Sequence, residues 1–215
     1  RLSLPRLIWW HKISTMKQLF CLLLFASMTT AHVVAQDLQL AFSNSHAAEL
    51  RGDYKGAIAA LTATKDNSYL VQLRLGYLHY QANSATEAMN HYQLAIRQRP
   101  FAIEPRLGMA NAAALANNWA QVQAQYEAIL KIDPNQTYIN YQLGMIYYNK
   151  KDYAKALRHF EKVVNLYPGD YDASIMLGWT HLRMGKLKEA KVLFQQVLLL
   201  RPNNASALEG LSLIK

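Results

Sequence analysis

Apolar and small side chains recur along most of the chain at a fixed interval of 34 residues. When repeats are counted from residues 69, 103, 137 and 171, position 24 is always aromatic and position 20 is mostly alanine. The aromatic residues are Tyr92, Tyr126, Phe160 and Phe194, and the prolines at position 32 are Pro100, Pro134, Pro168 and Pro202. A period of roughly 20 to 50 residues is typical of stacked supersecondary units. The pattern therefore predicts repeats over 69–102, 103–136, 137–170 and 171–204.

Each repeat is predicted to consist of two helices joined by a tight turn. Position 15 carries Asn83, Asn117, Lys151 and Gly185, which are mostly residues that tolerate the left-handed conformation ending a helix. Position 16 carries Ser84, Asn118 and Asp152, which favour the N-cap of the next helix. The proline at position 32 has no N–H group and is expected to end the second helix.

The pattern also extends beyond the four full repeats. The stretch 38–68 contains the same turn in Gly52-Asp53-Tyr54 but lacks the closing proline, and it predicts a shorter first unit. Residues 205–215 have the apolar spacing of a first helix without its partner, and Leu208 and Leu211 are expected to face inward. Such a helix would cap the last apolar face of the array, so that the repeat domain covers 36–215.

These positions resemble the signature of the tetratricopeptide repeat family. The best-matching repeat carries Leu143, Gly144, Tyr147, Ala156, Phe160 and Pro168, while the repeat over 103–136 departs most from the pattern. The resemblance implies an all-α fold, a right-handed α-solenoid of helical hairpins. A glycine inside a helix costs about 1 kcal/mol relative to alanine, so the glycines at position 8 need a compensating contact. We expect Gly144 to face Ala156 on the partner helix.

In this family, positions 2, 5, 9, 12 and 13 of the first helices line a concave groove that binds extended or helical peptides. The resemblance implies the following candidates for protein or peptide binding: Tyr77, Tyr80, Asn111, Tyr138, Tyr141, Met145, Tyr148, Trp179 and Arg183. Tyrosine and tryptophan provide large contact areas with a polar group. Packing between neighbouring first helices is the alternative for each of them. Of the residues in the family's carboxylate clamp for chaperone tails, only Asn111 is present, so a chaperone-tail adaptor is not expected.

The sequence lacks the motifs of the common catalytic and metal sites. It has no Gly-x-Ser-x-Gly, no phosphate-binding glycine loop, no His-Glu-x-x-His and no paired cysteines. The histidines after residue 35 are His46, His79, His91, His159 and His181, and no two stand three or four apart on one helix face. Asp170 and Asp172 lack the glycine and glutamate of a calcium loop and are expected to start the following helix. We therefore expect no enzyme activity, no cofactor and no metal.

Residues 16–35 have the layout of a secretory signal peptide, with Lys17 before an apolar centre at 19–26 and small residues before Gln36. A buried or amphipathic N-terminal helix is the alternative. The apolar centre is shorter than the roughly 18 residues that span a bilayer, so no transmembrane anchor is expected after signal removal. Residues 1–15 precede the first methionine and are expected to be an upstream extension of the gene model. The protein is therefore predicted to be periplasmic or secreted.

The charge of the chain is distributed unevenly. The whole sequence has 23 basic and 14 acidic residues. Residues 36–136 hold eight of each sign, whereas residues 137–215 hold eleven basic and six acidic residues. A basic cluster can attract acidic protein, anionic lipid or nucleic acid, although a solvated helix face explains it equally well.

Two functions from different classes follow from these observations. The first is an exported, non-catalytic scaffold or adaptor that binds a protein or peptide in its groove. The alternative is a regulatory or substrate-recruiting subunit of a cell-envelope enzyme complex. Nucleic-acid binding is less well supported, because it would require a cytoplasmic chain.

We predict cleavage of the signal peptide between Ala35 and Gln36. Intact mass spectrometry of the exported protein should give a chain that begins at Gln36. A mature species that retains residues 19–26 would contradict the prediction.

Overall fold

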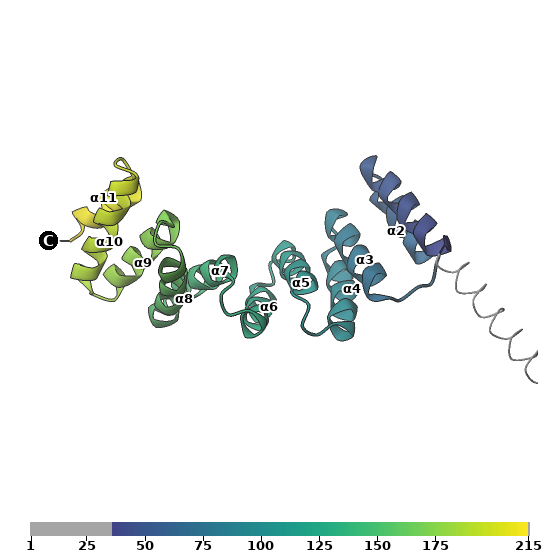
Figure 1. Ribbon diagram of the computed structural model, residues 1–215, viewed down its shortest axis with the longest axis horizontal. Coiled ribbons are helices and arrows are strands. Elements are labelled where there is room, and N and C mark those ends of the chain that lie inside the picture. Colours follow the sequence, from purple (N-terminus) through teal and green to yellow (C-terminus); the bar gives the residue numbers. More distant parts are fainter. Residues whose placement is uncertain (1–35, 215) are drawn as a thin grey trace, which may run out of the picture.

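The computed structural model describes residues 36–214, which form an elongated, curved row of helices without a strand in this part of the chain (Figure 1). Each helix contacts the next one along the row, which confirms the expected all-α solenoid. None of the helices in this range combines the length and apolar character needed to cross a bilayer. The predicted signal peptide and the residues before it lie outside the described residues.

The helices alternate between first and second members of successive hairpins. A helix over residues 36–50 precedes those labelled in Figure 1. These are α2 (Tyr54–Thr62), α3 (Tyr69–Gln81), α4 (Ala85–Gln98), α5 (Glu104–Leu115), α6 (Trp119–Ile132), α7 (Thr137–Asn149), α8 (Tyr153–Leu166), α9 (Tyr171–Arg183), α10 (Leu187–Leu200) and α11 (Ala205–Ser212).

The tight turns inside the hairpins have the predicted backbone conformation. Positive φ angles occur at Gly52, Asn83, Asn117, Lys151 and Gly185. Asn118 and Asp152 accept hydrogen bonds from the backbone N–H groups of Gln121 and Lys155 at 3.1 and 3.2 Å. Ser84 occupies the same N-cap position, but its side chain makes no capping hydrogen bond. The turn geometry is thus common to all hairpins, whereas the capping interaction is not.

The proline at position 32 ends each second helix by constraining the backbone of the residue before it. Arg99, Asp133, Tyr167 and Arg201 have φ angles of −132°, −133°, −133° and −141°. A proline disfavours the helical conformation in the preceding residue because its ring collides with that residue's backbone. Asp170 then caps α9 by accepting a hydrogen bond from Ala173 N at 3.0 Å, as predicted for the start of that helix.

In three of the four full repeats the aromatic ring at position 24 packs directly on a glycine at position 8. A Cβ atom on Gly144 would lie 2.6 Å from the ring of Phe160, and one on Gly178 would lie 2.8 Å from Phe194. Phe160 and Phe194 are completely buried. The side chain nearest to Gly144 is therefore the ring of Phe160, and not Ala156 as expected.

The same rings also contact the hairpin that follows. Gly108 on α5 abuts the ring of Tyr92, and Gly210 on α11 abuts the ring of Phe194. Each of these rings is therefore held between its own first helix and the first helix of the next unit. This arrangement joins neighbouring units through one side chain.

The terminal helix α11 corrects the expectation for Leu208. Its inward face consists of Ala207 and Gly210, with Leu211 packed against the last hydrophobic cluster. Leu208 is 49% exposed. Leu208 stands at position 4, which in the full repeats is covered by position 23 of the second helix. Because no second helix follows α11 among the described residues, this position has nothing to pack against here.

Four clusters of buried hydrophobic residues follow one another along the row. All of them lie within residues 36–214, and consecutive helices contact each other throughout this range. A segment with its own hydrophobic core can fold alone. We therefore expect the chain from Gln36 onward to fold without the residues before it.

Four histidines of this row, His79, His91, His159 and His181, are buried or partly buried, whereas His46 is exposed. His91 and His159, both at position 23, lie 2.7 and 3.1 Å from the side-chain oxygens of Gln72 and Asn140 at position 4. The rings of His79 and His91 stack at 5.1 Å. Burial lowers the pKa of His79, His91, His159 and His181 below the ordinary value of 6.5. No group of three possible metal ligands occurs in the described part of the chain.

We predict that Gly144→Leu lowers the free energy of unfolding. Overpacking of this kind costs roughly 1 to 3 kcal/mol, and Phe160 is too well enclosed to move aside. Chemical denaturation should show a lower midpoint for Gly144→Leu and a smaller decrease for Gly144→Ala. Gly169→Ala is the control, because a Cβ atom there would have no neighbour within 4 Å. Equal midpoints for Gly144→Leu and the control would contradict the ring contact.

We also predict that the protein loses stability as the pH falls below about 6.5. The unfolded chain takes up protons on its histidines near this pH, whereas in the folded protein burial keeps the four histidines with lowered pKa values neutral to a lower pH. The stabilisation is therefore complete above the unfolded pKa and is lost as the pH falls towards the folded values. Thermal melts at about pH 7.5 and 5.5 measure the change.

The double variant His91→Gln and His159→Gln tests this cause. Glutamine already occupies position 23 in another repeat, as Gln125, and it does not titrate in this range. The double variant should have a smaller difference between the two melts. An unchanged difference would mean that these histidines are not responsible.

Candidate functional site

A pocket of about 700 Å³ lies where α5, α6 and α7 meet. It brings together four of the residues predicted to bind a partner, namely Asn111, Tyr138, Tyr141 and Met145. The other lining residues are Ala114, Trp119, Val122, Tyr126, Gln142, Ile146, Asn149 and Lys150. We call this feature the central pocket.

Two large aromatic side chains at the central pocket are open to solvent. Trp119 at the start of α6 is 55% exposed, and Tyr138 at the start of α7 is 57% exposed. Tyr141 is partly buried and meets the ring of Phe160 edge-on at 5.8 Å. Burial, together with the neighbouring Tyr138 phenol, raises the pKa of the deeper Tyr126 to about 12. Tyr126 therefore keeps its O–H group at neutral pH as a potential hydrogen-bond donor.

Lys150 is the only charged residue that lines the central pocket. Its ammonium group donates a hydrogen bond to Gln123 Oε1 at 2.5 Å. Gln123 Nε2 donates to Glu127 Oε1 at 2.7 Å, and the Tyr147 hydroxyl donates to the same oxygen at 2.6 Å. These hydrogen bonds from Tyr147 and Gln123 lower the pKa of Glu127. This series of hydrogen bonds links α6 to Tyr147 on α7 and to Lys150, which directly follows α7.

Tyr77 lies in a second pocket, of about 440 Å³. Its lining also includes Phe42, Leu70, Leu73, Arg74, Tyr92, Glu104 and Gly108. Arg74 forms an ion pair with Glu49 on the helix over residues 36–50, and its guanidinium group lies 5.1 Å from the centre of the Tyr77 ring. Tyr80 is not part of either pocket, since it packs against the cluster that contains Tyr92 and Met109.

The three remaining predicted residues are Tyr148 on α7 and Trp179 and Arg183 on α9. Arg183 Nε donates to the Tyr148 hydroxyl at 3.4 Å. Trp179 Nε1 donates to Ser206 Oγ at 2.8 Å, and its ring meets Phe194 edge-on at 5.5 Å. These contacts make packing a substantial part of the role of Trp179. The predicted residues are thus distributed over the second pocket, the central pocket and the contacts between α7, α9 and α11.

Trp119 and Lys150 were not predicted from the sequence, because the groove of the family is formed by five positions on the first helices and neither residue stands at one of them. Trp119 stands at position 17, the first residue of a second helix. The same position holds Tyr54, Tyr153 and Leu187. This recurrence of aromatic and apolar residues at a helix start was the available signal.

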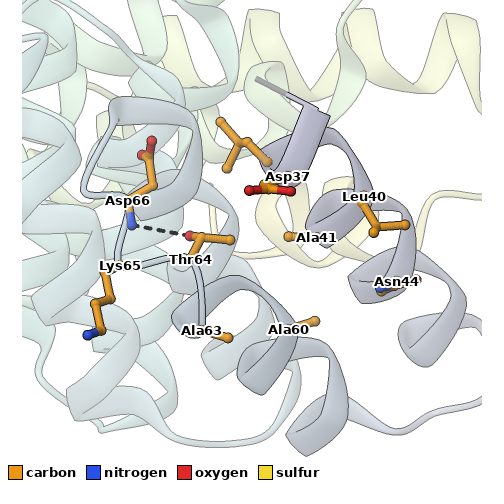
Figure 2. A pocket seen from close by; sticks show the side chains of 10 residues that line it. Asp37, Leu40, Ala41, Asn44, Ala60, Ala63, Thr64, Lys65 and Asp66 are labelled. Atoms are coloured by element: carbon orange, nitrogen blue, oxygen red, sulfur yellow. Dashed lines mark hydrogen bonds between the residues drawn. The ribbon is translucent and has the colours of Figure 1, made fainter. Parts of the chain in front are cut away.

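A third pocket, of about 720 Å³, lies at the N-terminal end of the row (Figure 2). Figure 2 shows Ala60, Ala63 and Thr64 facing Leu40 and Ala41 across it. Among the described residues no aromatic side chain lines it, and the charged residues that do are Asp37, Lys65 and Asp66. A pocket of small residues at the end of the row offers fewer contacts for recognition than the central pocket.

Solved structures with the same overall fold include several helical-repeat proteins. A tetratricopeptide repeat protein from Parabacteroides merdae has a TM-score of 0.68 at 19% identity, over 81% of this chain and 71% of that one. YrrB, described as a TPR protein with an unusual peptide-binding site, has a TM-score of 0.66 at 16% identity, over 86% and 97%. The MamA protein has a TM-score of 0.65 at 18% identity, over 76% and 91%. These similarities show the fold.

Sequence comparison identifies the family. The RNA polymerase-associated protein CTR9 from Caenorhabditis elegans is 27% identical over 99 residues, which are 46% of this chain and 9% of that protein's length. One sequence model of the tetratricopeptide repeat matches residues 45–103 and 107–171, and another matches residues 147–212. Since these matches cover more than half of the sequence, the chain belongs to the tetratricopeptide repeat family.

Proposed function

We propose that this protein is an exported scaffold without catalytic activity, which binds a protein or peptide at the central pocket. Export rests on the signal-peptide pattern of residues 16–35. The observation that carries the binding role is the pair of exposed aromatic side chains, Trp119 and Tyr138, at the mouth of a pocket of about 700 Å³. Aromatic residues of this kind dominate the binding energy of protein interfaces.

The lining of the central pocket indicates which ligand suits it. Tyr141, Met145 and Ile146 provide an apolar wall, and the side chains of Asn111 and Asn149 provide amide groups for a peptide backbone. No acidic residue lines the pocket, and Lys150 adds a positive charge at its edge. The best fit is a peptide segment with an aromatic or aliphatic anchor beside an acidic residue.

The similarity to YrrB supports a peptide as the ligand at the level of the fold. That protein is described as having an unusual peptide-binding site. Repeat proteins of this architecture present extended surfaces to their partners. Our proposal that the peptide binds at the central pocket rests on the residues that line this pocket, and not on the similarity to YrrB.

We predict that peptides selected for binding to this protein depend on Trp119 and Tyr138. Phage-displayed random peptides are selected against the chain from Gln36 onward, and the enriched sequences are synthesised. They should contain an aromatic or aliphatic residue close to an aspartate or glutamate. Trp119→Ala and Tyr138→Ala should each weaken binding by about 30-fold, the loss expected for truncation of a hot spot.

Tyr167→Ala is the matched control for this experiment. Tyr167 is 59% exposed, as much as Tyr138, but it lies outside the central pocket, in the loop that follows α8. The control should bind the peptides normally, and all three variants should melt close to the unchanged protein. Peptides that bind equally to all variants, or the absence of any enriched sequence, would refute the proposed site.

A further inference from the structure

Two adjacent hairpin turns, 149–155 and 183–189, form one edge of the solenoid in its C-terminal half. They join α7 to α8 and α9 to α10. The helices α7 and α9 are in contact, and the Arg183–Tyr148 hydrogen bond of 3.4 Å ties their C-terminal ends together. The two turns therefore lie side by side. We call these residues the basic edge.

The basic edge carries an excess of exposed positive charge. Its basic residues are Lys150, Lys151, Lys155, Arg183, Lys186 and Lys188, all of them exposed, and its acidic residues are Asp152 and Glu189. Asp152 caps α8 and pairs with Lys155 at 2.9 Å, so its charge is already compensated. Lys151, Lys186 and Lys188 form no salt bridge within residues 36–214.

The other turns and loops compared here lack a charge excess of this size. The equivalent turns of the two preceding repeats hold only Glu87 in 81–87 and no charged residue in 115–121. The loops at the opposite ends of α8 and α10 hold Asp170, Asp172 and Arg201 in 165–172 and 199–206. The C-terminal half of the solenoid is thus polarised across its width, with the positive side at the hairpin turns.

Exposed apolar side chains lie among these lysines. Met184 is 36% exposed and Leu187 is 41% exposed, and they stand on either side of Gly185 and Lys186. A solvated helix face gains nothing from such side chains. Apolar side chains beside lysines suit the boundary between lipid headgroups and acyl chains.

We propose that the basic edge docks the protein on the surface of an anionic phospholipid bilayer. Clusters of lysine residues are attracted to anionic lipid headgroups. Five of the six basic residues are lysines, which act as point charges, whereas recognition of nucleic acid favours arginine and stacked aromatic side chains. Lys151, Lys186 and Lys188 line none of the three pockets described above. They stand on a rim, which suits a flat surface better than a peptide.

The repeats themselves supply substitutions that remove this charge with little effect on the fold. Lys151 has a φ of 62°, and Asn83 and Asn117 have φ values of 57° and 56° at the same position. Asparagine tolerates this conformation better than lysine, so Lys151→Asn should not destabilise the turn. Lys186→Ser and Lys188→Ala likewise introduce residues that other repeats have at positions 16 and 18, namely Ser84 and Ala120.

The edge variant combines Lys151→Asn, Lys186→Ser and Lys188→Ala. The matched control combines Lys65→Asn, Arg97→Gln and Lys131→Ala, which removes the same number of positive charges from exposed positions elsewhere. Lys65 also has a positive φ, of 55°, so the two variants include equivalent backbone changes. Melts of all variants check that each remains folded.

Flotation with vesicles tests the proposal on the chain from Gln36 onward. We expect binding to equimolar phosphatidylglycerol and phosphatidylcholine, no binding to phosphatidylcholine alone, and weakening by salt. The edge variant should lose affinity by about 100-fold, as the loss of three surface lysines implies, while the control stays within a few-fold. If the edge variant does not fold, Lys151→Asn and Lys188→Ala alone should each show a loss of about 5-fold.

A second pair of substitutions separates a bilayer from a soluble polyanion. Met184→Gln with Leu187→Ala should weaken binding to the anionic vesicles but leave binding to polyglutamate and duplex DNA unchanged. The proposal is overturned if anionic vesicles are not bound, or if the edge variant and the control lose affinity equally. It is also overturned if polyglutamate or DNA binds more tightly than the vesicles. Peptide binding at the central pocket is measured separately, so either proposal can fail alone.

Discussion

The solenoid depends on one buried aromatic ring per repeat. The ring at position 24 is held against the first helix of its own hairpin, and in two repeats against a glycine of the next hairpin as well. Glycine weakens a helix, so its repeated use here must be offset by the close packing that it permits. Because one side chain serves both hairpins, the helix pair and the stacking of pairs are stabilised together. This coupling is the nearest-neighbour interaction through which repeat proteins gain stability.

Whether position 24 holds a tyrosine or a phenylalanine is related to where the pockets lie on the solenoid. The second pocket includes Tyr92 and the central pocket includes Tyr126, and both tyrosines stand at position 24. The last two repeats have Phe160 and Phe194 at this position, and both are completely buried. A tyrosine has to place its hydroxyl group near a polar partner or solvent, so its ring reaches the pocket. In these two repeats position 24 therefore contributes both to the packing of the hairpins and to the lining of a pocket.

Much of the fold follows from local residue types, and these could be predicted. Asn117 and Gly185 define turns through their backbone conformation, and Pro168 ends a helix by a steric effect on Tyr167. Neither of these two effects depends on residues that are distant in the sequence. The site depends on contacts between repeats, which the sequence does not display. Trp179 belongs to the same stripe as Tyr141, yet Ser206 on α11 accepts its hydrogen bond. Leu208 has the spacing of a buried residue, but among the described residues no second helix follows α11 to cover it.

The conformation of the hairpin turn constrains some of its positions and leaves others free to vary between repeats. Position 15 must adopt a positive φ and position 16 lies at a helix start, whereas the neighbouring turn residues contact little of the core. These positions can therefore differ between repeats at small cost, and they do: the turn at 115–121 is uncharged, and the turns at 149–155 and 183–189 are basic. A lysine at position 15 is less favourable than the asparagine of the other repeats. The basic edge therefore lies where the fold is permissive, and its charge is not needed for folding.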